Sequence, residues 1–399
     1  MSAVYTFAIG LYVLKTTGSG LSFAVTLSLQ ILPTVLLAPL AGVLADRLNK
    51  KALVIATDAF GGALFIALYL TSGNGLTLRA VYAATLLLSV SQTLYNVCVD
   101  AAVPDLVSAR RVPTLNSIGK IADSAASMLS PALGGILYAA VDIRLFVLLN
   151  AAAFVLSTLS ECLIDFRLYA APHSPAGKFS PARDLAEGFR VIRKTEWMRS
   201  ALLNFLLINF FVAVGYSVPV PYILNHFYGL PSEAYGTIQC FMPAGMIAGA
   251  LLAKRIAARV PFGRLTAVTG ICCSLCLILS GMLPALRPHA GQGLTVPYYS
   301  FVLFCAGLII TLIDVPFINN FQLRVPEEYR GRSLSISVSA VKVFAPAGYI
   351  LSGGLLGITP VFFPPLCGGA LLLLSAVAVN RRLLFRRFHP GKRRGAPPV

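Results

Sequence analysis

The sequence predicts an all-α integral membrane protein with twelve transmembrane helices in two related six-helix bundles. The chain of 399 residues is 57% hydrophobic and only 12% charged, whereas a typical soluble protein is about a quarter charged. Apolar runs that can cross about 30 Å of hydrocarbon recur along its whole length. Inside lipid the backbone must satisfy its own hydrogen bonds, which a helix does. Finally, parts of the second half of the chain echo the first.

Twelve apolar spans follow one another, with boundaries placed to about 2–4 residues. They cover residues 1–14, 21–45, 51–72, 79–101, 114–139, 144–165, 200–224, 232–256, 264–284, 298–320, 333–357 and 360–380. The first gives only about 21 Å of helix at 1.5 Å per residue. We therefore expect this helix to be truncated, with the true start upstream or its cytoplasmic side incomplete. It has no basic segment or cleavage site, which argues against a signal peptide.

The basic residues predict the orientation. The formal net charge is +17, and Lys and Arg gather in every second loop and in the C-terminal tail. The opposite loops hold only Lys15, Arg79, Arg144 and Arg287. Because cytoplasmic loops carry the excess of Lys and Arg, both termini are expected in the cytoplasm. The charge also favours contact with lipid headgroups. Nucleic-acid binding is the competing reading, but no binding module is present.

A linker divides the spans six and six. Pro172, Pro175 and Pro181 interrupt regular structure, and Ala182–Lys194 reads as a short amphipathic helix on the cytoplasmic membrane face. The predicted organisation is a first bundle (1–165), a linker (166–199), a second bundle (200–384) and a basic tail (385–399).

The two halves echo each other at matching topological places. The segment "VPDLVSARRVPTLNS" from Val103 is similar to "VPEEYRGRSLSIS" from Val325. Likewise, "SPALGG" from Ser130 is similar to "APAGYILSGG" from Ala345. Duplicated halves are typical of transporters whose substrate site lies between them near the bilayer midplane.

The turn between the second and third spans carries a motif. "GVLADRLNKK" resembles the loop motif of the major facilitator superfamily, in which a Gly precedes Asp-Arg, a further Gly and basic residues. The matching positions are Gly42, Asp46, Arg47, Lys50 and Lys51. Asn49 replaces the usual Gly, and Asn also tolerates a left-handed turn. In the family this turn latches one conformation of the cytoplasmic side. A plain positively charged loop is the alternative.

The resemblance extends over nearly the whole chain. "VPDLV", "SPALGGILY" and "VPEEYRGR", with the motif, look like the macrolide-efflux and enterobactin-exporter branch of this superfamily. The resemblance implies a twelve-helix major facilitator fold and export of small, often amphipathic molecules against proton entry, a property linked to drug resistance. The counterpart of the motif in the second half, "GALLAKRIAAR", has Lys254 near the position of the Asp. The resemblance therefore implies a latch role only for the first-half motif.

Other chemistries have little support. The four histidines fall in loops or termini without a nucleophile pattern, and no phosphate-cradling loop is present. Cys273 and Cys276 form a Cys-x-x-Cys inside an apolar span without a second ligand pair, which predicts packing rather than a metal site. We expect no enzyme activity, no metal and no cofactor.

Ionisable residues inside spans are costly and are candidates for proton coupling. Asp123 is the leading proton carrier, with Lys120 one turn away on the same helix face. A locally neutralised structural pair is the alternative reading. Further candidates are Asp314, Lys342 and Asp100, the last more simply an interfacial helix-end residue. We expect Asp58 to be a structural acid.

The substrate pocket should be mostly apolar with a few polar anchors. Family architecture places helices one, four, seven and ten around it, with their neighbours contributing. The candidates are Tyr5, Gln30, Gln92, Tyr95, Asn96, Met128, Asn204, Asn209 and Met242. Each one alone is also consistent with packing. The glycines Gly245 and Gly249 are expected to serve close helix packing.

The sequence therefore predicts a monomeric secondary transporter of the bacterial inner membrane. It should export a small amphipathic molecule by alternating access, in exchange for protons. A siderophore or metabolite exporter of the same fold, an uptake carrier and a non-transporting sensor or scaffold remain open alternatives.

Overall fold

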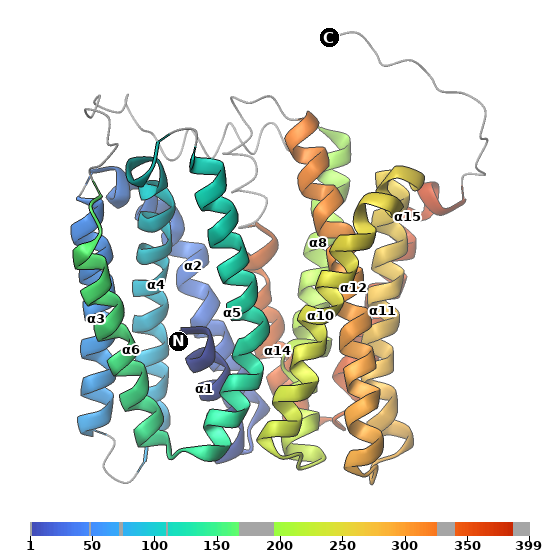
Figure 1. The fold of residues 1–399 in the computed structure, drawn as a ribbon. Coiled ribbons are helices and arrows are strands. Elements are labelled where there is room, and N and C mark those ends of the chain that lie inside the picture. The colour runs from blue at the N-terminus through green and yellow to red at the C-terminus, as the bar shows by residue number, and fades with distance from the viewer. Residues whose placement is uncertain are drawn as a thin grey trace.

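The computed structural model describes residues 2–47, 49–71, 75–108, 111–166, 195–324 and 340–385. Throughout these ranges the regular elements are helices. Figure 1 shows them as two bundles standing side by side, the first in blue to green and the second in yellow-green to red. The predicted amphipathic helix of the linker lies outside the described ranges.

The first bundle contains six long helices. Their bounds are α1 Ser2–Thr17, α2 Gly20–Arg47, α3 Lys50–Thr71, α4 Leu78–Leu106, α5 Val112–Ala140 and α6 Ile143–Leu163. Local capping sets several starts. Thr77 accepts a hydrogen bond from the Ala80 amide at the start of α4, and Asp142 accepts one from the Arg144 amide at the start of α6. Such caps satisfy amides that a helix leaves unpaired.

The second bundle is less regular. Its elements are α8 Glu196–Val212, η2 Ala213–Ser217, α9 Pro219–Tyr222, η3 Ile223–Phe227, α10 Ser232–Arg259, α11 Phe262–Leu286, α12 Gln292–Arg324, α14 Ala345–Ile358 and α15 Phe363–Phe385. The seventh predicted span is thus one helical rod with two π-helical turns, next to Pro219 and Pro221. Proline cannot donate the usual helical hydrogen bond, and π turns often occur at functional sites. The described part of the eleventh predicted span begins at Ala340. A turn at Phe344 interrupts this helix before α14.

Most of these helices are long and apolar enough to cross a membrane. Nine candidate spans lie in the described residues, and two shorter apolar helices cover Leu129–Ala140 and Phe363–Val379. Many large apolar side chains also face outward, including Leu70 at 74% and Leu251 at 76% exposure. An outward apolar surface of this kind suits contact with lipid.

Aromatic packing fills the interior of the first bundle. Tyr5 is 2% exposed. Its ring meets Phe65 edge-on at 4.7 Å between centroids and stacks with Phe146 at 6.4 Å. Phe65 continues the contact to Phe154 at 5.5 Å. This cluster ties α1, α3 and α6 together, so Tyr5 belongs first to the core of its own bundle.

The bundles touch at the end that holds the α1–α2, α5–α6, η3–α10 and α14–α15 connections, called here the closed end. The Lys15 amine donates a 2.7 Å hydrogen bond to the Ser232 hydroxyl across it. A side-chain carbon on Gly135 would lie 2.7 Å from the Ser232 carbonyl oxygen, and one on Gly353 would lie 2.7 Å from the Gly20 carbonyl oxygen. Glycine thus permits backbone-to-backbone contact here.

This close contact generates a prediction. Gly353→Leu should push α14 away from α2 and shift the protein toward a state with the closed end open. Gly354→Leu is the matched control, because a side-chain carbon there meets nothing within 4 Å. In a cysteine-free background, spin labels at Ile136 and Thr237 should move apart only in the Gly353 variant. Equal distance distributions in both variants would contradict it.

Candidate functional site

A cavity of about 680 Å³ lies between the two bundles. Helices α1, α2, α4 and α5 line it from one side, and η2, α9, η3, α10 and α14 line it from the other. The lining residues are Thr6, Phe7, Gly10, Leu11, Leu14, Phe23, Leu27, Gln30, Ile31, Gln92, Asn96, Ser130, Pro131, Tyr216, Ser217, Pro221, Asn225, Tyr235, Gln239 and Tyr349. A volume of this size lies in the range of pockets for drug-sized molecules.

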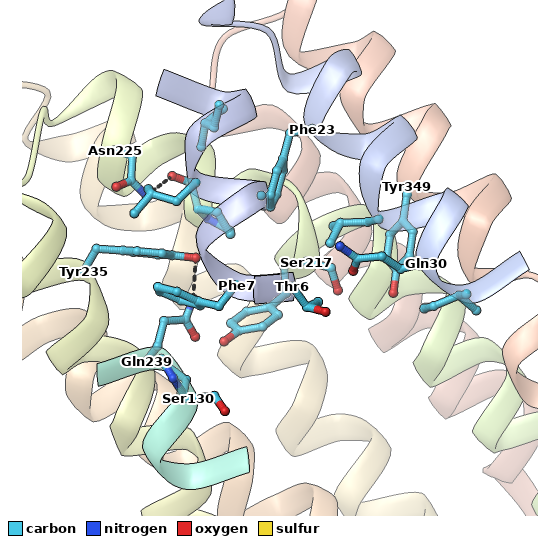
Figure 2. Close-up of a pocket in the computed structure, with 18 of the residues that line it drawn as sticks. Thr6, Phe7, Phe23, Gln30, Ser130, Ser217, Asn225, Tyr235, Gln239 and Tyr349 are labelled. Carbon is cyan, nitrogen blue, oxygen red and sulfur yellow. Dashed lines mark hydrogen bonds between the residues drawn. The ribbon is translucent and has the colours of Figure 1, made fainter. Parts of the chain in front are cut away.

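An aromatic pair crosses the cavity wall between the bundles. Phe7 of α1 stacks on Tyr235 of α10, with ring centroids 5.2 Å apart and an interplanar angle of 16°. Figure 2 shows both rings beside the cavity, with the Gln239 amide reaching the Tyr235 hydroxyl. That hydrogen bond is 2.9 Å long. The fixed rings offer flat apolar faces with little freedom left to lose on binding.

A few amides supply polar anchors. The Gln30 side-chain nitrogen and the Asn225 side-chain oxygen are buried without a hydrogen-bond partner in the described structure. Asn225 uses its nitrogen to donate to the Pro221 carbonyl at 2.9 Å, and Gln92 donates to Asn96 at 3.3 Å. Buried polar groups normally find partners. The two free amide atoms are therefore the clearest positions for a substrate to form hydrogen bonds.

The cavity is electrically neutral in its described part. Its lining residues are apolar, aromatic, hydroxyl or amide side chains, and none of those named above carries a formal charge. Polar recognition by this surface therefore depends on amides and hydroxyls.

Three of the predicted pocket residues line this cavity, namely Gln30, Gln92 and Asn96. Tyr5 instead borders a smaller recess of about 100 Å³ that also touches Gln30 and Gln92. Helices α2 and α4 thus bring Gln30, Gln92 and Asn96 to one cavity, while the core position of Tyr5 leaves it at the edge.

The other predicted pocket residues lie elsewhere. Asn204 and Asn209 donate to carbonyl oxygens one turn back in α8, at 2.9 and 3.0 Å. Tyr95 packs in a cluster with Val54 and Cys98. Met242 accepts a 3.5 Å hydrogen bond from the Tyr216 hydroxyl behind the lining. The Met128 side chain is outside the described part of the chain.

The tenth span, α12, supplies none of the cavity-lining residues named above. Gly245 and Gly249 of α10 and Gly307 of α12 leave no room for a side chain between these two helices. The expected packing role of Gly245 and Gly249 is seen directly. This contact lets α10 face the cavity, so Tyr235 and Gln239 line it, four residues apart on one helix face.

Sequence reasoning did not identify several lining residues, chiefly Tyr216, Ser217, Asn225, Tyr235, Gln239 and Tyr349. One signal was available. Ser217 and Asn225 flank the prolines Pro219 and Pro221 within an otherwise apolar span, and interrupted helices in transporters point to binding sites.

The three predicted coupling residues whose side chains are described do not line the cavity. Asp314 is exposed on α12, Asp100 is exposed on α4, and Lys342 is exposed just before α14. The side chains of Lys120 and Asp123 fall outside the described structure.

The turn motif is partly visible. The Lys50 amine contacts the Asp105 carboxylate at 2.7 Å and donates to the Ala101 carbonyl at 2.9 Å. Lys51 donates to the Cys162 and Ile164 carbonyls, each at 2.9 Å. The motif thus ties the start of α3 to the ends of α4 and α6. The side chains of Asp46 and Arg47, and the surroundings of Gly42, are not described.

Asn49 does not adopt the left-handed conformation considered for it. In the described chain no residue other than glycine has a positive φ. Asn49 instead accepts a 3.3 Å hydrogen bond from the Ala52 amide. It therefore caps the start of α3, a role that Asn fills well.

Two helical bundles with a cavity at their interface are the arrangement of a multi-pass membrane transporter. The sequence matches the Major Facilitator Superfamily over residues 1–349. The chain belongs to this superfamily, and the predicted all-α major facilitator fold is confirmed.

Relatives in sequence include bacterial efflux proteins. The chain is 26% identical to the MFS-type transporter YfiS of Bacillus subtilis, over 90% of this chain and 86% of that protein. It is 26% identical to macrolide efflux protein A of Streptococcus pyogenes, over 88% and 84%. It is 24% identical to the multidrug efflux pump Tap of Mycobacterium tuberculosis, over 86% and 80%.

Solved structures share the fold. A mutant of the nucleoside transporter NupG aligns with a TM-score of 0.71 at 13% identity, covering 94% of this chain and 95% of that one. A bacterial homologue of the iron transporter ferroportin, in an inward-facing state, aligns with a TM-score of 0.67 at 15% identity and covers 95% of both chains.

The lysine contact predicts how the motif acts. Lys50→Met should remove a charged hydrogen bond worth about 1.5–3 kcal/mol and lower the initial transport rate at equal expression. The exchange Lys50→Asp with Asp105→Lys should restore part of it. Arg79→Met, an exposed charge at the other end of α4, is the control. A charge-exchanged protein no better than Lys50→Met would show that pairing is not what matters.

Proposed function

We propose that this transporter exports a small, uncharged or weakly polar amphipathic molecule by alternating access, in exchange for protons. The main observation that supports this proposal is the neutral cavity. Its apolar lining holds stacked aromatic rings and a few buried amide atoms without a hydrogen-bond partner in the described structure. The apolar walls favour binding of the apolar part of a ligand, and hydrogen bonds to the amides fix the orientation of the ligand. A siderophore would instead call for cationic side chains, which the described lining lacks.

The relatives support the direction of transport. Macrolide efflux protein A and the multidrug efflux pump Tap are each similar over more than four fifths of this chain. Both names describe export, and the cavity volume suits a drug-sized molecule. The proposed substrate class is therefore drug-like and amphipathic.

The contacts support alternating access. The closest bundle-to-bundle contacts in the described chain lie at the closed end, and the motif turn lies at the opposite end. A further bond between the bundles, from the Ser28 hydroxyl to the Pro346 carbonyl at 3.4 Å, lies about two turns along α2 from that end. Lys15 and the close glycines hold the closed end together. The positive-inside rule would place the motif end in the cytoplasm, with both termini there, in a bacterial inner membrane. We propose a monomer that contacts anionic lipids through its basic loops.

The direct test uses everted membrane vesicles with an imposed pH gradient and a panel of neutral, cationic and anionic fluorescent molecules. Uptake of neutral amphipathic molecules, abolished by collapsing the gradient, is the expected result. Uptake confined to anionic molecules, or unchanged without the gradient, would contradict the proposal. Vesicles from cells without the protein provide the background.

The aromatic pair yields a specific prediction. Tyr235→Ala should remove one face of the stack and raise the transport KM roughly 2- to 10-fold, since such ring contacts are worth about 0.5–1.5 kcal/mol. Tyr235→Phe keeps the stack and should change KM less. Phe301→Ala on α12, where the ring is 64% exposed, is the control for loss of an aromatic ring. Equal KM values for Tyr235→Ala and Phe301→Ala would show that the Tyr235 ring does not contribute to substrate binding.

A further inference from the structure

Two carboxyl groups face each other away from the cavity, in the first bundle. Asp58 of α3 is 6% exposed and Glu161 of α6 is 4% exposed. Their helices lie side by side at the outer edge of the bundle (Figure 1). The two side chains interact directly, with the Ser157 hydroxyl and the Tyr95 hydroxyl beside them. Three helices thus contribute to one polar cluster.

This cluster lacks a compensating cation in the described structure. Both carboxyl oxygens of Glu161 are buried and make no hydrogen bond of ordinary geometry there. The two lysines at the start of α3 are bound by other groups, Lys50 by the Asp105 carboxylate and Lys51 by the carbonyls of Cys162, next to Glu161, and Ile164. The neighbouring titratable group on α4 is Tyr95, which is neutral in its ordinary state.

Two carboxylates side by side in low dielectric cannot both stay ionised without a cation. The arrangement that removes the repulsion places one proton between them, so that one carboxylic acid donates to the other carboxylate. One of the two buried Glu161 oxygens then gains a hydrogen-bond partner.

An apolar layer separates the pair from the motif turn. Val54 lies one turn before Asp58, Cys98 and Ala102 lie beyond Tyr95 on α4, and Phe166 follows α6. These four side chains form one buried cluster between the acids and the Lys50–Asp105 contact. Water reaches the acids from that end only if α3, α4 and α6 move relative to one another.

Helix α4 links this cluster to the cavity. Tyr95 faces the acids, while its neighbour Asn96 and Gln92 line the cavity. A rotation or shift of α4 that repacks the cavity therefore also moves a wall of the acid cluster. A movement of α4 therefore changes the cavity and the acid cluster together, which is what coupling between the two sites requires.

From these observations we infer that Asp58 and Glu161 form a proton-binding site that holds one shared proton in this conformation and releases it when the bundle repacks. The site is also the carrier of the coupling proton; this last step rests on the proposed function. On release, the O–H bond of the acid breaks, the proton passes to entering water, and the electron pair stays on the carboxylate.

The first experiment needs no substrate. Infrared spectra of the purified full-length protein at neutral pH should show the C=O band of a protonated carboxyl, which the double variant Asp58→Asn/Glu161→Gln loses. The control Asp142→Asn removes a water-exposed acid at the other end of α6 and keeps a capping side chain. It should retain the band. Identical spectra for wild type and the double variant would overturn the proton site.

The second experiment tests coupling in proteoliposomes. The double variant should lose accumulation driven by a pH gradient and keep substrate exchange without a gradient, because a neutral pair cannot release a proton. Accumulation equal to that of Asp142→Asn would overturn the carrier role. So would loss of both accumulation and exchange, which would mark the pair as structural. If the wild type moves no tested molecule, the proposed function fails, while the infrared result still decides the proton site.

Discussion

The hydrocarbon core of a membrane holds no water that could form hydrogen bonds with a buried polar group. Most polar groups of this chain must therefore find their hydrogen-bond partners within the protein. The backbone is satisfied within helices. Hydroxyl side chains such as Thr57 and Thr269 donate to carbonyls of their own helices. Against this background, a buried polar atom without a partner is informative. In the described residues such atoms occur on Gln30 and Asn225 at the cavity, on Glu161 at the acid pair, and also on Thr85, Asn150 and Ser300.

The same constraint explains how two bundles can separate and rejoin. Lipid-like surfaces gain little from associating in a membrane, so close backbone contact and specific polar bonds must hold an interface. The closed end uses both, through Gly353, Gly135 and the Lys15–Ser232 bond. The motif lysines, in contrast, tie α3 to α4 and α6 within one bundle. One end is therefore held between bundles and the other stiffened within a bundle, which permits rigid-body rocking.

The sequence was enough to predict the helices, because hydropathy reports burial in lipid directly. It predicted the cavity less well, because lining depends on which face of each helix turns inward. That rotation is set by packing, as where glycines pack α12 against α10. Asn209 and Asn204 look like pocket residues in a span, yet each bonds its own helix. Glu161 was not among the residues identified from the sequence, and only the packing of α3 against α6 brings it to Asp58.

The proposed separation of the substrate site from the proton site has a physical consequence. A charged group in the cavity would favour ligands of opposite charge and would titrate differently with each substrate. A neutral cavity joined through α4 to a distant acid pair avoids both effects, because the protons then respond to helix position rather than to ligand chemistry. Only the difference in affinity between two conformations can couple the sites. Many unrelated amphipathic molecules can then drive one cycle, provided that each of them prefers the same arrangement of α4.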